Sequence, residues 1–120
     1  MLRSLLCNQE FYAKVGGDGL PEYVFTSADQ HIAATKASTL DAELIIHRAL
    51  APEITITGPD TATGVWTLHD IVKTPQFEFE GHCHYFENYR KEDGQWKVSR
   101  IEYKKRAHFA FEKTVIPIGK

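Results

Sequence analysis

Cysteine is scarce in this sequence. Its 120 residues include only Cys7 and Cys83, too few to form the disulfide framework of a small secreted domain. No apolar run approaches the roughly 20 residues of a membrane-spanning helix, and the apolar stretch at residues 2–7 is shorter than the core of a signal peptide. We therefore expect a cytoplasmic protein with no membrane partner.

Excess charge of either sign is also missing. The formal net charge is −2, and the basic cluster at residues 104–106 is too short for the electrostatic footprint of a nucleic-acid-binding protein. With 42% hydrophobic and 25% charged residues, the composition is that of an ordinary globular chain. We expect residues 1–120 to form a single domain that does not bind nucleic acid.

The most regular stretch runs from residue 77 to residue 106. Apolar and polar residues alternate along it, as in a half-buried strand, and the Asp-Gly pair at positions 93 and 94 is typical of a hairpin turn. One face of the first strand carries Phe77, Phe79, Gly81, Cys83, Tyr85, Glu87 and Tyr89.

The return strand changes parity part-way along. Trp96 and Val98 share one face, whereas a straight strand would place Ile101 and Tyr103 on the other. One residue near positions 99–100 is therefore predicted to bulge, and a bulge bends the sheet.

Shorter elements precede the hairpin. Ser27 and Gln30 have the spacing of a capping box, which predicts a helix through about residue 38. The other predicted elements are a helix end at residues 1–7, an extended segment at 10–12, a loop at 16–21, and strands at 44–50, 53–57 and 61–72. This order predicts an α+β domain of four to six antiparallel strands, in which a helix covers one face of a bent sheet.

A carboxylate stands in an apolar row of the predicted strand at residues 61–72. Its neighbours on the same face are Trp66, Leu68 and Val72. A buried carboxylate needs a hydrogen-bonding partner, so Asp70 is a candidate functional residue.

Three segments together resemble the SnoaL-like proteins of the nuclear transport factor 2-like superfamily. They are the runs at residues 62–70, 81–85 and 87–98. The resemblance implies a cone-shaped α+β fold with a deep pocket, in a dimer or higher oligomer. Within the superfamily the chain is similar to scytalone dehydratase and the bacterial bile-acid dehydratase.

The resemblance also implies a site. It places the active-site histidine of these enzymes at His47 and an aspartate partner at Asp70, where Asp70 would fix the tautomer of a general base. The pocket-lining positions it implies are Tyr12, Trp66, Leu68, Val72, Cys83, Tyr85 and Glu87. A second pocket histidine of scytalone dehydratase falls at Val72, so that enzyme's full site is absent.

Two kinds of function follow from the resemblance. The first is a dehydratase, isomerase or cyclase that acts on a small hydrophobic polycyclic substrate, such as a polyketide or steroid. The second is a non-catalytic small-molecule-binding or dimerisation domain. The family's first helix, with its catalytic tyrosine, has no counterpart here, and that absence favours the second.

His82, His84 and Glu80 share the other face of the hairpin strand. Two imidazoles and a carboxylate can ligate a metal. No third histidine approaches them in sequence, and the resemblance puts the pocket on the opposite face. We therefore expect no metal and no other cofactor.

We expect a homodimer or a larger homo-oligomer. Without a first helix, Phe11, Tyr12 and Trp66 would be poorly covered, and self-association tends to bury exposed apolar surface of this kind. Sedimentation velocity at micromolar concentration tests this. A clean monomer that binds no hydrophobic dye would contradict it.

Overall fold

The computed structural model describes residues 3–17, 20–75 and 78–110. Its elements are η1 (Arg3–Leu5), β1 (Tyr12–Gly17), β2 (Leu20–Phe25), α1 (Ala28–Ser38), β3 (Leu44–Ile56), β4 (Thr61–Lys73), β5 (Glu78–Glu92) and β6 (Gln95–Ala110). Phe77, predicted to begin the hairpin, lies outside the described residues. Within the described ranges, no helix is both long enough and apolar enough to cross a membrane.

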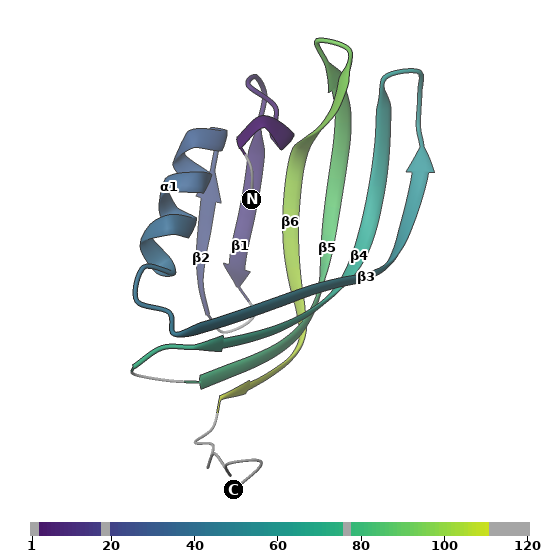
Figure 1. Ribbon diagram of the computed structural model, residues 1–120. Helices are drawn as coiled ribbons and strands as arrows, with labels where there is room; N and C mark the ends of the chain where they lie inside the picture. The colour runs from purple at the N-terminus through teal and green to yellow at the C-terminus, as the bar shows by residue number, and fades with distance from the viewer. Residues whose placement is uncertain (1–2, 18–19, 76–77, 111–120) are drawn as a thin grey trace, which may run out of the picture.

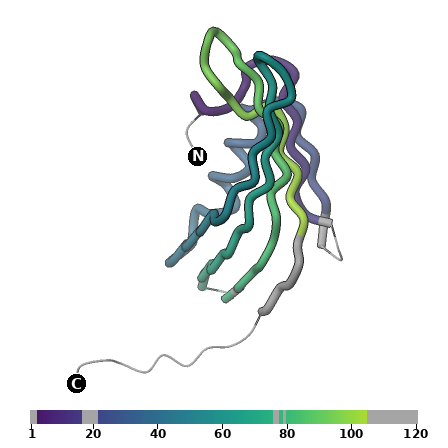
Figure 2. The backbone as a smooth tube through the Cα atoms, turned by 90° about the vertical axis from the view of Figure 1, so that its right-hand side faces the viewer, coloured from purple at the N-terminus to yellow at the C-terminus, as the bar shows by residue number. Residues whose placement is uncertain are grey.

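The six strands form one sheet in the order β2-β1-β6-β5-β4-β3. The sheet is strongly curved and α1 lies inside the curve (Figure 1), as the view turned by 90° also shows (Figure 2). The predicted α+β class and the bent sheet with its covering helix are confirmed. The fully antiparallel arrangement is wrong, because β1 pairs with β6 in parallel.

Two local predictions also need correction. Residues 16–17 and 20–21, predicted to lie in a loop, belong to β1 and β2, which pair antiparallel. Strand β3 runs on through Pro52, because the register shifts between Leu50 and Glu53 and Ala51 has a positive φ of 48°. A proline has no N–H to donate, so it is tolerated at such a bulge.

The hairpin predicted at residues 77–106 is confirmed, because β5 pairs antiparallel with β6. Its turn has positive φ at both Asp93 (55°) and Gly94 (77°), as a type I′ hairpin turn requires. Asn88 pairs with Arg100 but Tyr89 pairs with Val98, so the residue left over on β6 is Ser99. The predicted bulge is therefore at Ser99, whose hydroxyl donates to the Asn88 carbonyl at 3.2 Å.

The buried core lies where α1 meets β1 and β6. Its cluster consists of Leu6, Phe11, Ala13, Ala28 and Ile101. The Ser27 hydroxyl accepts a hydrogen bond from the Gln30 amide at 3.1 Å, which confirms the predicted start of the helix. Phe11 was expected to be poorly covered, but it is only 4% exposed.

We call the sheet face that carries Ala13, Asp70 and Ile101 the inner face, and the opposite one the outer face. The three positions share a face because Ala13 pairs with Ile101, Ile101 pairs with Glu87, and strand alternation continues from Glu87 to Gly81, the partner of Asp70. The core therefore occupies one end of the inner face.

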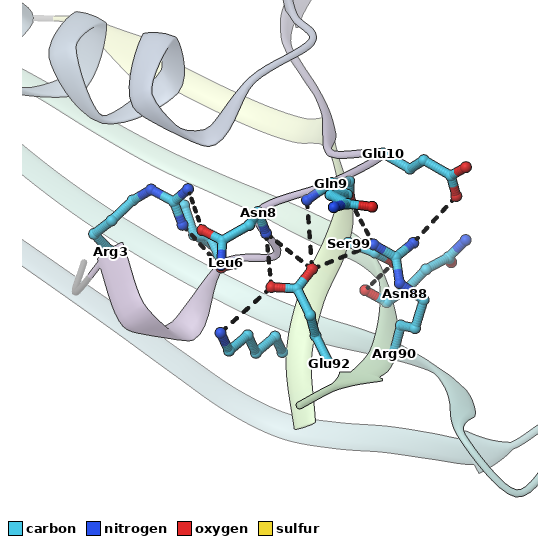
Figure 3. A network of polar contacts seen from close by, with 10 residues as sticks. Arg3, Leu6, Asn8, Gln9, Glu10, Asn88, Arg90, Glu92 and Ser99 are labelled. Carbon is cyan, nitrogen blue, oxygen red and sulfur yellow. Dashed lines mark hydrogen bonds and ion pairs between the residues drawn. The ribbon is translucent and has the colours of Figure 1, made fainter. Parts of the chain in front are cut away.

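The segment after η1 is hydrogen-bonded to the turn end of the β5–β6 hairpin (Figure 3). The Glu92 carboxylate accepts hydrogen bonds from the Asn8 amide at 2.9 and 3.0 Å and from the Gln9 amide at 3.4 Å. Arg90 donates to the Gln9 carbonyl. The Asn8 amide holds the pKa of Glu92 below its ordinary value, so the carboxylate stays charged and keeps these bonds.

His31 is buried among aromatic rings, and we expect it to make the stability of this fold depend on pH. It is 7% exposed, its Nδ1 has no hydrogen-bond partner among the described residues, and its ring lies 5.9 Å from Phe11 and 5.5 Å from Phe25. Burial lowers its pKa from the ordinary 6.5, so below pH 6.5 the unfolded chain takes up a proton that the folded chain resists.

The free energy of unfolding should therefore fall as the pH drops from 7 through 6.5 toward 5. His31→Leu should lack this part of the fall and be at least as stable at pH 7. Urea unfolding of both proteins across this pH range measures the difference. Parallel pH profiles would show that His31 is not held neutral by the core.

Candidate active site

The structure brings His47 and Asp70 together. They are direct partners in the antiparallel pairing of β3 with β4, and His47 Nδ1 lies 2.5 Å from Asp70 Oδ1. The two side chains differ sharply in exposure: that of His47 is 53% exposed and that of Asp70 is 6%. Asp70 therefore holds one nitrogen of an imidazole whose other edge can meet a substrate.

Two tyrosines stand beside this pair on the inner face. The Tyr103 hydroxyl donates a long hydrogen bond to Asp70 Oδ2 at 3.5 Å, and the Tyr103 ring lies 5.3 Å from that of Tyr85. Burial raises the pKa of both phenols, with the Asp70 charge adding to it. Both hydroxyls, already protonated at neutral pH in an ordinary tyrosine, are held still more firmly in that form and can donate hydrogen bonds.

Tyr103 was missing from the predicted site. Strand β6 reaches it only after the bulge at Ser99, which returns the following odd-numbered positions to the inner face. The parity change in the sequence contained this signal. What it could not show was that the Tyr103 pairing with Tyr85 would bring its hydroxyl to Asp70.

The predicted pocket residues divide into two groups on the inner face. Leu68 and Cys83 are buried cross-strand partners next to Asp70, and the Cys83 thiol approaches the Leu68 carbonyl at 3.8 Å. Val72 is half-buried and two residues beyond Asp70 on the same strand face. With Tyr85, these residues give the pair an apolar surrounding.

The second group consists of Trp66 and Glu87, which are linked by hydrogen bonds through Tyr89 farther along the strands. Trp66 Nε1 donates to the Tyr89 hydroxyl at 2.8 Å, and that hydroxyl donates to Glu87 Oε2 at 2.6 Å. Burial raises the pKa of Glu87, although the Tyr89 hydrogen bond opposes it. Glu87 lies six residues from Gly81, the partner of Asp70, which is about 20 Å along β5. These hydrogen-bonded residues therefore do not touch the histidine–aspartate pair.

Gly64 leaves space for the Tyr89 side chain. A Cβ at this position would stand 2.6 Å from the Tyr89 hydroxyl and 2.8 Å from a carbon of its ring. The absence of a side chain is therefore what lets Tyr89 lie flat enough to bridge Trp66 and Glu87.

Tyr12, predicted to line the pocket, lies on the opposite face of the sheet from the other predicted pocket residues. Its neighbour Ala13 belongs to the core on the inner face, so strand alternation points Tyr12 to the outer face. There the Arg100 guanidinium lies 4.1 Å from the centre of its ring. The short extended segment gave no indication of which face would be covered.

A polar hollow lies at the other end of the hairpin. It is lined by Asn8, Gln9, Glu10, Arg90, Glu92 and Asp93. From Gly81, the partner of Asp70, to Arg90 is about 30 Å along β5. This hollow is therefore separate from the histidine–aspartate pair.

Comparison with known proteins identifies the family of this chain. A family model described as a SnoaL-like domain matches residues 7–102. The chain belongs to this SnoaL-like family.

Solved structures with the same fold share little sequence with it. A proposed scytalone dehydratase from Novosphingobium aromaticivorans is 16% identical, with a TM-score of 0.77 over 98% of this chain and 78% of its own. A hexachlorocyclohexane dehydrochlorinase from Novosphingobium barchaimii is 14% identical, with a TM-score of 0.77 over 96% and 79%. A nuclear transport factor 2-like protein of unknown function from Pseudomonas putida is 14% identical, with a TM-score of 0.65 over 85% and 68%.

The hydrogen bond between His47 and Asp70 should set the histidine tautomer in this SnoaL-like chain. A carboxylate at Nδ1 favours a proton on that nitrogen and leaves Nε2 as the acceptor. Long-range ¹H–¹⁵N NMR of the imidazole should therefore show Nδ1–H in the wild type and loss of that preference in Asp70→Ala. Arg48→Gln, next to His47 in sequence and on the other face of β3, is the matched control. Identical His47 spectra in wild type and Asp70→Ala would mean that the contact is absent in solution.

Proposed function

We propose that this SnoaL-like chain is a lyase or isomerase of the dehydratase type, with His47 as general base and Asp70 as its positioning partner. The observation that carries the proposal is the half-exposed imidazole held at Nδ1 by a buried carboxylate. A base must reach the substrate with one nitrogen while its protonated form is stabilised at the other. A histidine in the core would not be so exposed, and one on an ordinary surface would have no buried partner.

The proposed reaction removes water from a β-hydroxy carbonyl compound. His47 Nε2 takes the proton from the carbon next to the carbonyl, and the electron pair of that C–H bond forms an enolate. The enolate re-forms the carbonyl as the C–O bond to the β-hydroxyl breaks. The imidazolium returns its proton to the departing hydroxide, so the products are an α,β-unsaturated carbonyl compound and water, and His47 is again neutral.

Tyr85 is the proposed donor to the enolate oxygen, whereas the single hydroxyl proton of Tyr103 is given to Asp70. The Tyr85 phenol keeps its proton at neutral pH, because the ordinary tyrosine pKa is already well above 7 and burial raises the pKa of Tyr85 further. A positioned donor that meets charge as it develops in the transition state can contribute several kcal/mol, roughly 2.7–4 for one donor. Tyr85 would supply the hydroxyl for which the sequence offered no counterpart.

The surroundings of the pair favour a hydrophobic substrate. Leu68 and Cys83 are buried beside Asp70, and Val72 and the Tyr85 ring extend the same apolar surface. A polycyclic or polyketide-like molecule matches such a surface better than a sugar or a nucleotide does, because those need many polar partners.

A second copy of the chain is the proposed partner. Strand β3 ends the sheet, and its Leu44, Leu50, Ile54 and Ile56 are between 45% and 67% exposed. Apolar residues on an edge strand favour pairing with another chain. This exposure supports the homodimer expected from the sequence.

The chemistry can be tested with a panel of aromatic and polycyclic β-hydroxy ketones, with loss of water followed by mass spectrometry. Turnover of one panel member should fall about 10²-fold or more in His47→Gln, because a positioned base contributes that much, and in Asp70→Ala. Arg48→Gln should keep wild-type activity. Turnover that is unchanged in His47→Gln would overturn the assignment of the base. Tight binding of panel members without any turnover would instead favour the non-catalytic binding domain.

A further inference from the structure

The outer face of the sheet carries a second cluster of ligating side chains. His69 on β4 and His82 on β5 are direct cross-strand partners, with their rings stacked at 4.7 Å and 14° apart in plane. Glu80 lies two residues before His82 on the same face. Sequence spacing had paired His82 with His84; the structure instead supplies the missing histidine from the neighbouring strand.

All three side chains converge on one point. Glu80 Oε2 lies 3.5 Å from His69 Nε2, and Glu80 Oε1 lies 3.9 Å from His82 Nε2. One ligand atom from each residue lies within 4.8 Å of the others. Both imidazoles therefore present the same nitrogen to one carboxylate.

We propose that His69, Glu80 and His82 form a binding site for a divalent transition-metal ion, with Zn²⁺ the best fit. Tetrahedral zinc with bonds of about 2.0–2.1 Å needs ligand atoms about 3.3 Å apart. Side-chain rotation can supply the remaining contraction, because the three side chains are between 24% and 48% exposed. Three protein ligands leave the fourth position to water.

The donor set decides which metals fit. Two imidazole nitrogens suit Zn²⁺, Co²⁺, Ni²⁺ and Cu²⁺, whereas Mg²⁺ and Ca²⁺ prefer sites made entirely of oxygen. The backbone holds the set in place, since β4 and β5 stay in unbroken register from Thr61 to Lys73. Cys7 and Cys83 are 0% and 1% exposed, so neither thiol competes for the ion in the folded protein.

A positive charge near the cluster opposes the site. Arg48 on β3 is the partner of His69 and is exposed, so its guanidinium lies on the same face as the metal. Its repulsion acts mostly through solvent and is screened by salt. Removing this charge should not weaken the site, so Arg48→Gln should bind Zn²⁺ at least as tightly as the wild type.

The proposal does not depend on the catalytic one, because Asp70 and His69 point to opposite faces of β4. Zn²⁺ titrated into the full chain by calorimetry should bind with one ion per chain. Zn²⁺ affinity should fall at least about tenfold in each of three variants, His69→Gln, His82→Gln and Glu80→Gln. Losing even a residue that only supports a metal ligand typically lowers metal affinity by that much. His84→Gln, on the same strand face, is the matched control and should bind as the wild type does.

Co²⁺ gives a second measurement. Its visible absorption should show the intense bands of a four-coordinate site in the wild type and lose them in His69→Gln, while circular dichroism confirms that each variant is folded. The proposal fails if folded wild type binds Zn²⁺ no better than His69→Gln. It also fails if His84→Gln or His47→Gln, and not His69→Gln, removes the binding, since either result would place the ion elsewhere.

Discussion

One extra residue in β6 sets the inner face of this protein. Because Ser99 has no partner opposite it, the strand resumes its alternation with the parity reversed, and both Val98 and Ile101 pack toward the core. Without the bulge, Ile101 would turn to solvent and Tyr103 would leave Asp70. The same extra residue adds bend to the sheet, as do the register shifts between Leu50 and Glu53 and between His82 and Cys83. The packing of Ile101 in the core and the approach of Tyr103 to Asp70 thus share one cause.

Consecutive residues of β4 serve two faces with different chemistry. Asp70 is buried and hydrogen-bonded, so its carboxylate can hold a base in one tautomer. His69 points outward, where a part-exposed ring can rotate toward a metal. The two proposed roles need opposite surroundings: a positioning carboxylate works best away from water, whereas a metal ion must enter from it. Strand alternation separates these surroundings without any additional structure.

The exposure of β3 keeps His47 accessible to a substrate. A catalytic histidine buried as deeply as Asp70 could not meet a substrate, and His31 shows the alternative, an imidazole enclosed by Phe11 and Phe25 whose pKa falls through burial. His47 lies on the edge strand, supported on one side only. The pairing with β4 fixes its position, while the open edge keeps one nitrogen available.

Local patterns in the sequence determined the hairpin turn, the helix cap at Ser27, the bulge at Ser99 and the need of Asp70 for a partner. Each depends on residues a few positions apart, whose propensities and alternation act within one element. Only the tertiary structure decided the parallel pairing of β1 with β6, the outward face of Tyr12 and the approach of Tyr103 to Asp70. It also placed His69 beside His82. These contacts depend on register between strands distant in sequence, which the packing of the whole sheet selects and no single segment encodes.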